Sequence, residues 1–247
     1  MGEDGPRSEV FTTMLVNAAG QVADWSAHHE RLRQHGERLR MKVPDESPQI
    51  PDLEPDEHPW RLLRLAYTPS TSEWTWSLRS CSIRNERLDA ISVLAPRWNQ
   101  RTTGCKHGDW NPYLEAHDDA IKVGADVALL VHEHSIIDAD RGTPILLDED
   151  GTVWMAAHSQ GGVDGITAMM LESALPGRGF PVLRGKLNER LVARCHELVV
   201  VGSGLGVCRI ESLDDEPLGE SELLSSACQS ILDQHFTDDG VWTALRP

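Results

Sequence analysis

A polar segment at residues 96–104 divides the sequence into two parts with different patterns. It consists mainly of arginine, threonine, amide, proline and glycine residues and has neither a helical nor a strand period. Before it, most apolar runs alternate in the manner of strands, and after it short strand and helix patterns follow one another. These patterns predict an α+β protein with a small N-terminal lobe at 1–95, an interlobe loop at 96–104 and a larger lobe at 105–247.

The N-terminal part is predicted to contain a hairpin, a helix and further strands. Residues 17–20 separate two strand patterns and predict a hairpin turn. Ser26 can cap a helix that runs to about Met41, because a serine hydroxyl accepts from the amides of a first helical turn. The segment 42–59 is rich in proline and acidic residues and predicts an exposed connection. The strands are expected at residues 10–16, 21–24, 60–67, 74–83 and 89–94.

The C-terminal part is predicted to alternate short strands with helices. Asn111 and Gly124 bracket one helix, with a proline in its first turn. Its expected buried face consists of Ala116, Ala120, Ile121 and Val123. Further helices are expected at residues 166–175, 187–194 and 221–236. Further strands are expected at residues 126–132, 136–137, 144–147, 152–156, 180–183, 197–201 and 207–211.

The charge and hydropathy patterns limit the possible partners. A formal net charge of −16 disfavours nucleic acid and anionic membrane surfaces, so we expect a small-molecule substrate or a second copy of the chain. No apolar run approaches the roughly 20 residues of a membrane-spanning helix. The first six residues lack the basic and apolar regions of a signal peptide. A soluble, cytoplasmic protein is therefore expected.

Neither a metal site nor a disulfide framework is expected. The five cysteines are scattered and include no Cys-x-x-Cys pair. His28 and His29 would point apart on a helix, and His132 and His134 would share a strand face without a clear third ligand. Ser-His-Asp catalysis is also disfavoured, because no Gly-x-Ser-x-Gly elbow occurs.

Lys106 is the leading candidate for covalent chemistry. It follows the polar segment and precedes a predicted helix, and the residues after it include the aromatic Trp110 and Tyr113 rather than other lysines or arginines. An amine at such a position can form a covalent bond to a carbonyl carbon once it loses its proton. Partial burial beside a cation or an apolar wall lowers a lysine pKa in that direction.

Two segments are candidates for binding an anion. Residues 165–167 begin a predicted helix, whose N-terminus presents free amides to a negative charge, although an ordinary helix cap explains them equally well. Residues 202–206 form a glycine-rich connection between two strands and include Ser203. Their spacing matches neither the dinucleotide nor the Walker pattern, and a plain tight turn is the simpler interpretation.

The order of these candidates resembles that of the class IV aminotransferases, the fold-type IV pyridoxal-phosphate enzymes. That family includes branched-chain aminotransferases, D-amino acid aminotransferases and 4-amino-4-deoxychorismate lyases. The resemblance implies a two-lobed fold with a small α/β lobe and a larger pseudo-barrel lobe, and a homodimer. It covers about residues 9–215 and is carried by Val10-Phe11-Thr12-Thr13, His28-His29-Glu30-Arg31-Leu32, Lys106, Asp138, Gly165-Ile166-Thr167 and Gly202-Ser203.

The resemblance also implies roles for individual residues toward pyridoxal 5'-phosphate. Lys106 would hold the cofactor as a Schiff base and act catalytically, and Arg31 would bind its phosphate. Ile166, Thr167 and Ser203 would bind the same phosphate through amides and hydroxyls.

An acid beside the pyridine nitrogen is expected at Asp138, where the family has a glutamate. Asp140 is the competing candidate, because residues two apart share one face of a strand. Aspartate is shorter by one methylene, so its contact with the ring nitrogen requires a small shift or a bridging water.

The substrate is less constrained than the cofactor. Thr13, Arg97 and Trp110 are candidates for substrate contact. The expected reaction is transamination of an amino acid. The alternatives are release of pyruvate from aminodeoxychorismate, which the opening block resembles locally, and an inactive dimer that keeps only the fold.

Overall fold

The computed structural model describes residues 5–51, 53–83 and 85–246, and the chain in it divides into two compact units. Unit 1 comprises the described residues of 1–83 together with 99–110 and 234–247, and unit 2 those of 84–98 and 111–233. Residues 1–4, on which the expected lack of a signal peptide partly rests, lie outside the described residues.

Unit 1 contains a five-stranded sheet in the order β15-β2-β1-β3-β4. Strands β1, β3 and β4 pair antiparallel along their lengths, and β2 returns from β1 as the predicted hairpin. This sheet accounts for the alternating apolar residues of the N-terminal part. Its strands are β1 (Val10–Asn17), β2 (Val22–Ala23), β3 (Trp60–Thr68), β4 (Glu73–Ser80) and β15 (Trp242–Thr243).

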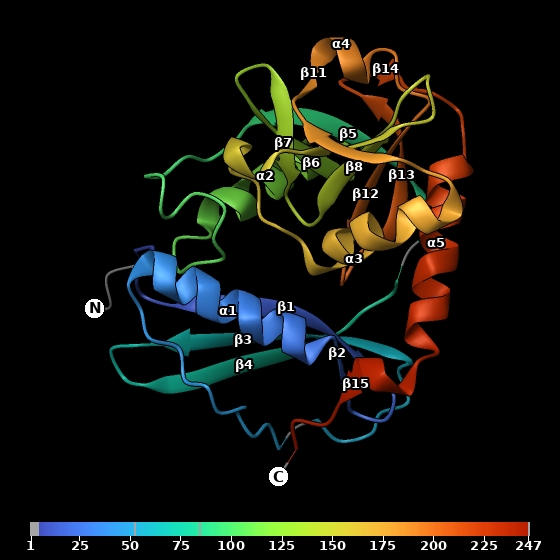
Figure 1. Cartoon of the computed structure of the whole chain (residues 1–247). Helices are drawn as coiled ribbons and strands as arrows, with labels where there is room; N and C mark the ends of the chain where they lie inside the picture. Colours follow the sequence, from blue (N-terminus) through green and yellow to red (C-terminus); the bar gives the residue numbers. More distant parts are fainter. Residues whose placement is uncertain (1–4, 52, 84, 247) are drawn as a thin grey trace. The chain divides into compact units, whose positions relative to one another are not determined.

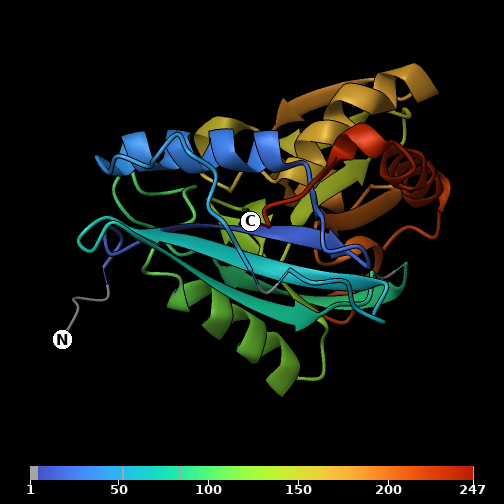
Figure 2. The same ribbon diagram turned by 90° about the horizontal axis from the view of Figure 1, so that it is seen from below.

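Helix α1 (Trp25–Leu39) lies along one face of this sheet (Figures 1 and 2). It begins one residue before the predicted cap Ser26, which lies within the helix. The N-cap is Asp24, in a left-handed conformation and without a side-chain capping bond, and its carbonyl accepts from the N–H of His28. The prediction of Ser26 as the cap was therefore wrong. The buried face of α1 contains Trp25, His28, Arg31, Leu32, His35, Gly36 and Leu39.

The predicted exposed connection at 42–59 contributes to the core of unit 1. Ile50 and Leu53 are fully buried, and Val43 is nearly so. The N–H of Ile50 also donates to the carbonyl of Leu245 at 2.7 Å. The prediction failed because the few apolar residues of this acidic segment all point inward, which average composition does not reveal.

Unit 2 is built on a ten-stranded sheet that is barrel-like. Its main path runs β10-β9-β8-β12-β13-β5-β6-β7-β11, and β14 pairs with β13. Strand β5 pairs in parallel with β6 and β13, whereas most other ladders are antiparallel. The strands are β5 (Arg87–Leu94), β6 (Val127–His132), β7 (Ser135–Ala139), β8 (Thr143–Leu147), β9 (Val153–Ala156), β10 (Val182–Gly185), β11 (Leu187–Asn188), β12 (Glu197–Gly202), β13 (Gly206–Leu213) and β14 (Glu216–Pro217).

The predicted helices all occur, although their faces and lengths differ in part. Ala116 and Ala120 on α2 are buried as expected, but Ile121 is 56% exposed. Val123 lies just after α2 and is 69% exposed, so the expected buried face was too wide. The predicted helix 187–194 shortens to a single turn. The helices are α2 (Asn111–Lys122), α3 (Ile166–Ala174), α4 (Glu189–Val192) and α5 (Leu223–Phe236).

The expected lobe boundaries at 95 and 105 differ from this division. Strand β5 belongs to the sheet of unit 2, because it is hydrogen-bonded to β6 and β13. Residues 105–110 belong to unit 1, where Lys106 and His107 pair with the start of β1. The last strand, β15, pairs with β2 in unit 1.

Within the described part of the chain, none of the helices combines the length and apolar character required to cross a membrane.

Shortening Ile50 tests whether segment 42–59 belongs to the core. Ile50→Ala removes a fully buried side chain, and we expect the free energy of unfolding to fall by about 2–5 kcal/mol. Urea denaturation measures this change. Glu57→Ala, at an exposed position of the same segment, serves as the control and should change it by less than about 0.5 kcal/mol. Equal effects of the two substitutions would contradict the burial of Ile50.

Candidate active site

The backbone of Lys106 is held on both sides within unit 1. Its N–H donates to Nδ1 of His35 on α1 at 3.1 Å. Its carbonyl accepts from the N–H of Phe11 on β1 at 3.3 Å. The next residue, His107, forms an isolated antiparallel bridge with Val10. The chain is therefore attached to both α1 and β1 at the predicted covalent residue.

Two aromatic rings lie beside the amine of Lys106. Its Nζ is 4.5 Å from the ring centroid of Trp110 and 5.1 Å from that of Phe11. The two rings pack edge to face, with their centroids 5.1 Å apart. Aromatic faces attract a cation and restrict where the amine can lie. Trp110, a predicted substrate residue, is thus a neighbour of Lys106.

Arg31 is buried on the face of α1 that packs against β1. Its Nη2 donates to Oγ1 of Thr12 at 2.8 Å, and the same oxygen lies 2.7 Å from Nδ1 of His28. Because Thr12 accepts from Arg31, its hydroxyl proton is available for His28. Thr12, which precedes the proposed substrate residue Thr13, is the threonine in contact with this arginine.

Three buried histidines of unit 1 are kept neutral. Burial lowers the pKa of His28 well below its usual value, and the charges of Arg31 and Lys106 lower it further. The pKa of His35 is also lowered well below its usual value, by burial first and then by the surrounding cations. Burial lowers the pKa of His107 to about 4, opposed only in part by Asp109. The imidazoles therefore act as neutral hydrogen-bonding groups near pH 7.

Thr13 lies on the opposite face of β1 from Thr12, together with a cation that the sequence did not single out. Arg64 of β3 is directly opposite Thr13 in the antiparallel register. Its guanidinium lies 4.2 Å from the ring centroid of Phe11 and is paired with Glu9. Arg64 and Lys106 thus share contact with Phe11. The register of β1 against β3 produces this grouping, and it is not visible in the sequence.

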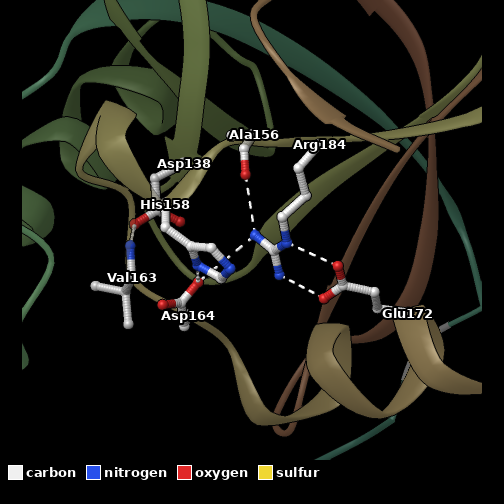
Figure 3. Close-up of polar contacts among 7 residues, drawn as sticks. All are labelled: Asp138, Ala156, His158, Val163, Asp164, Glu172 and Arg184. Carbon is white, nitrogen blue, oxygen red and sulfur yellow. Dashed lines mark hydrogen bonds and ion pairs between the residues drawn. The ribbon is translucent and has the colours of Figure 1, made fainter. Parts of the chain in front are cut away.

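In unit 2, Asp138 on β7 is 2% exposed and held by donors from two other segments. Its Oδ2 accepts from the N–H of Val163 (Figure 3) and from the hydroxyl of Tyr113 on α2, both at 2.9 Å. Burial and the neighbouring Asp138 raise the pKa of Tyr113 well above its usual value. Tyr113 therefore remains protonated and donates. These donors compensate the buried carboxylate for lost water.

Asp140, the competing acid, has a different environment. Its carboxylate is 2.7 Å from Nδ1 of His117 and 3.4 Å from Nε of Arg141. Burial raises the pKa of Asp140 despite these two partners. Asp138 and Asp140 are thus both buried, but Asp140 belongs to an ion-pair cluster, whereas Asp138 on β7 is hydrogen-bonded to the segment that leads into α3.

The segment that leads into α3 passes very close to β7. An added Cβ at Gly162 would lie only 2.0 Å from the carbonyl oxygen of Ile137. Glycine is therefore required for this close approach. The approach allows the N–H of Val163 to reach Asp138.

The predicted phosphate-binding residues of unit 2 lie together. Thr167 is in the first turn of α3, and its Oγ1 is 3.5 Å from Oγ of Ser203 in the turn between β12 and β13. Ile166 is the first residue of α3. The N-cap of this helix is Gly165, which has no side chain that could accept from the first amides. Helix geometry leaves the first amides of α3 without intrahelical acceptors. Two hydroxyls and a helix N-terminus therefore converge from segments far apart in the sequence.

Arg184, which the sequence analysis did not identify, connects β10 to this region. It makes two hydrogen bonds to Glu172 of α3, at 2.7 and 2.6 Å, and one to the carbonyl of Ala156 at 3.0 Å (Figure 3). It also lies 3.6 Å from Asp164, which is paired with His158 at 2.8 Å. Arg184 thereby holds α3 and the segment before it against the end of β10. No local sequence signal marks this pairing, because its members come from different elements.

Arg97, a predicted substrate residue, lies on the surface of unit 2. Its Nη1 donates to the carbonyl of Gln160 at 2.7 Å. Its charge is close enough to lower the pKa of Tyr113 slightly against the larger opposing effect of burial. The structure thus places Arg97 near the residues that hold Asp138.

The predicted site residues are divided between the two units, with Thr13 in unit 1 and Arg97 in unit 2. Unit 1 contains Arg31, Lys106 and Trp110. Unit 2 contains Asp138, Ile166, Thr167 and Ser203.

Comparison of the sequence with known families identifies the class of protein. The class IV aminotransferase family matches residues 9–213, and the chain belongs to this family of pyridoxal-phosphate-dependent aminotransferases and lyases. No curated protein is significantly similar to the chain.

Solved structures have the same fold at low sequence identity. A branched-chain aminotransferase from Thermoproteus uzoniensis is similar with a TM-score of 0.82 at 14% identity, covering 96% of this chain and 90% of that one. A protein from Legionella pneumophila assigned as a 4-amino-4-deoxychorismate lyase has a TM-score of 0.76 at 19% identity, covering 92% of this chain and 91% of that one. A hypothetical aminotransferase from Mycobacterium tuberculosis, in its PLP-bound form, has a TM-score of 0.76 at 16% identity, covering 92% of this chain and 89% of that one. These likenesses confirm the predicted fold class.

The buried histidines of unit 1 predict a loss of stability in mild acid. In unfolded chains histidines take up protons near pH 6.5, whereas His28, His35 and His107 have lowered pKa values in the folded protein. Their contribution to the free energy of unfolding is therefore complete above about pH 6.5 and declines as the pH falls toward the pKa values of the folded protein. The slope should be at most about 1.4 kcal/mol per pH unit for each histidine.

Urea unfolding between pH 7.5 and 5 measures this slope. His107→Asn should reduce it, whereas His134→Gln, at an exposed position, should leave it unchanged. A free energy of unfolding that stays constant from pH 7 to 5.5 would refute the prediction.

The hydrogen bonds between Arg184 and Glu172 should contribute measurably to the stability of unit 2. Arg184→Gln removes the paired hydrogen bonds to Glu172, and we expect the free energy of unfolding at pH 7 to fall by about 1–3 kcal/mol. Arg194→Gln is the control, because Arg194 forms an exposed ion pair with Glu149 and its loss should cost at most about 1 kcal/mol. Urea denaturation of both variants compares them, and similar small losses would show that the Arg184 pair contributes little.

Proposed function

We propose that this protein is a pyridoxal-phosphate-dependent aminotransferase that acts on an amino acid, with Lys106 as the residue that holds the cofactor covalently. The observation that carries the proposal is the placement of Lys106. Its peptide is bonded to α1 and β1, and its amine lies against two aromatic rings. A lysine that served only solubility would have no need of this support.

The donor groups of the chain fit the cofactor's phosphate. Thr167 and Ser203 supply two hydroxyls 3.5 Å apart at the N-terminus of α3. An added Cβ at Gly165 would lie 2.5 Å from Oγ1 of Thr143, so this turn cannot be enlarged without movement. Hydroxyls and helix amides of this kind suit a phosphate group. We assign Ile166, Thr167 and Ser203, together with Arg31, to phosphate binding.

Asp138 is assigned to the pyridine nitrogen. Its carboxylate is buried and oriented by Tyr113 and Val163, and its Oδ1 accepts from the N–H of Ala139. Asp140 is the weaker candidate, because its charge is already compensated by the cation Arg141, whereas the donors to Asp138 are neutral groups. A carboxylate oxygen with spare lone pairs can accept from a protonated ring nitrogen.

The residues then have separate tasks in the reaction. When bound, pyridoxal phosphate supplies a ring that withdraws electrons from the substrate's Cα. Asp138 would keep the ring nitrogen protonated. Released when the substrate amine takes its place, the amine of Lys106 would take the proton from the substrate's Cα as general base and deliver it to the C4' carbon of the cofactor as general acid. Thr13, Arg97 and Trp110 remain proposed substrate contacts, and Arg64 joins them because it shares the Phe11 ring with Lys106.

Release of pyruvate from aminodeoxychorismate is the second candidate reaction. The opening block of the sequence resembles that branch of the family, and one of the similar structures is assigned as such a lyase. An inactive protein that retains the fold is the third. We propose a cytoplasmic homodimer, whose scattering mass should be about twice that of the 27.4 kDa chain.

Lys106→Ala tests the proposed function. The wild-type protein incubated with pyridoxal 5'-phosphate should show a visible absorption band and, after borohydride reduction, a covalent phosphopyridoxyl group located on Lys106 by mass spectrometry. Lys106→Ala should show neither. Glutamate formed from amino acids and 2-oxoglutarate supports the aminotransferase, and pyruvate formed from aminodeoxychorismate supports the lyase. Cofactor bound without either product would favour the inactive protein, and a wild-type chain that binds no cofactor would exclude the proposal.

The two candidate acids can be separated by matched substitutions. If Asp138 contacts the ring nitrogen, Asp138→Asn should lower kcat by at least about tenfold, because it removes a negative charge beside the developing electron sink. Asp140→Asn should have a smaller effect on kcat. Steady-state kinetics and the absorption band of the bound cofactor would be measured for both variants. A larger effect of Asp140→Asn would reverse the assignment.

A further inference from the structure

We infer that His35 is a positioning residue for Lys106. Its neutral imidazole accepts a hydrogen bond from the Lys106 peptide and thereby fixes where the lysine side chain begins. The inference rests on the proposed function for its catalytic meaning. The placement of Lys106 by His35 can be tested without the cofactor.

The contact connects two segments that are distant in sequence. Nδ1 of His35 accepts from the N–H of Lys106 at 3.1 Å, and the His35 side chain is buried. On the other side of the same residue, the carbonyl of Lys106 accepts from the N–H of Phe11. A residue fixed at both its N–H and its carbonyl has little freedom at Cα. These two bonds therefore set the direction of the Cα–Cβ bond, from which the side chain extends toward the rings of Phe11 and Trp110.

The chemical form of His35 suits this role. Nδ1 can accept only when it carries no proton, so the ring must be neutral with its proton on Nε2. Burial and the nearby positive charges of Arg31, Arg38 and Lys106 lower the pKa of His35 and maintain that form. A carboxylate at this position would add a buried charge, and an apolar side chain would leave the Lys106 N–H without this acceptor.

The position of His35 on α1 links the lysine to a second proposed cofactor ligand. Arg31 precedes it by four residues, so the two side chains lie on the same helical face. That face packs against β1, where Arg31 donates to Thr12. One rigid helix therefore holds the proposed phosphate-binding arginine and the peptide of the proposed covalent lysine in a fixed relation.

Two substitutions of similar size separate positioning from mere packing. In His35→Asn, Oδ1 can take the place of Nδ1 as the acceptor. In His35→Leu, the acceptor is lost, but leucine is the better helix former and the better buried residue. If His35 only fills space in the core, the leucine variant should be at least as stable as the asparagine variant, and its Lys106 should be at least as reactive. A positioning role predicts the opposite order for the reactivity of Lys106, whatever the order of stability.

The first measurement is the rate at which the cofactor-free protein captures pyridoxal 5'-phosphate, trapped by borohydride on Lys106. His35→Leu should lower this rate by about 10- to 100-fold, because a small misplacement of a reacting group is costly. His35→Asn should restore it to within about threefold of wild type. His29→Leu is the matched control, since His29 lies on α1 but contacts Trp25 and Pro44 instead. Melting temperatures of all the variants accompany the rates.

The second measurement does not involve the cofactor. Reductive methylation with ¹³C-formaldehyde labels the amine of Lys106, and its NMR signal is assigned by its loss in Lys106→Ala. The rings of Phe11 and Trp110 should shift this signal, because they lie 5.1 and 4.5 Å from Nζ. His35→Leu should move the signal toward that of exposed lysines, while His35→Asn and His29→Leu should leave it in place.

The outcomes distinguish the two proposals. A wild-type protein that captures no cofactor, with the methyl signal moved only in His35→Leu, would reject the proposed function and retain the positioning role. A folded His35→Leu variant with an unchanged methyl signal and an unchanged capture rate would overturn the inference. So would a His35→Asn variant that behaves like His35→Leu in both measurements.

Discussion

The packing of α1 against β1 is the constraint on which the proposed site of unit 1 depends. Polar and charged side chains can be buried there only if each has a partner. Arg31 donates to Thr12, Thr12 contacts His28, and His35 accepts from the Lys106 peptide. The same face of α1 also buries Leu32 and Leu39 in the apolar core. Stability and the placement of Lys106 therefore depend on one interface.

Unit 2 contains a buried negative charge that also requires hydrogen-bonding partners. The carboxylate of Asp138 is buried in a barrel-like sheet, and its donors come from α2 and from the segment before α3. That segment is secured by Gly162, which passes close to β7, and by Arg184, which holds Glu172 and Asp164 (Figure 3). Thr167 and Ser203 lie just beyond it. The geometry around the proposed pyridine acid and the proposed phosphate site is thus fixed by shared elements.

Much of the fold could be predicted because it follows from local periodicity. The hairpin of β1 and β2, the strands β3, β6, β8 and β12, and the start of α3 agree with the alternating or helical patterns of the sequence. The errors occurred where local rules were overridden. Ser26 is not the cap of α1, because the helix begins earlier, after a left-handed Asp24. Ile50 and Leu53 are buried within an acidic, proline-containing segment because tertiary packing, not average composition, selects which side chains point inward.

By itself, the sequence determined the residues available for chemistry and their order, which were enough to predict the family and its fold. It indicated Lys106, Arg31, Asp138 and Thr167 as candidate site residues, since the family pattern is a property of residue types and spacing. Only the tertiary structure decided which partners hold them. His35, Tyr113 and Arg184 act across many residues of sequence. Such contacts depend on strand register and helix packing, and the direction of a side chain across an interface cannot be obtained from the periodicity of either segment alone.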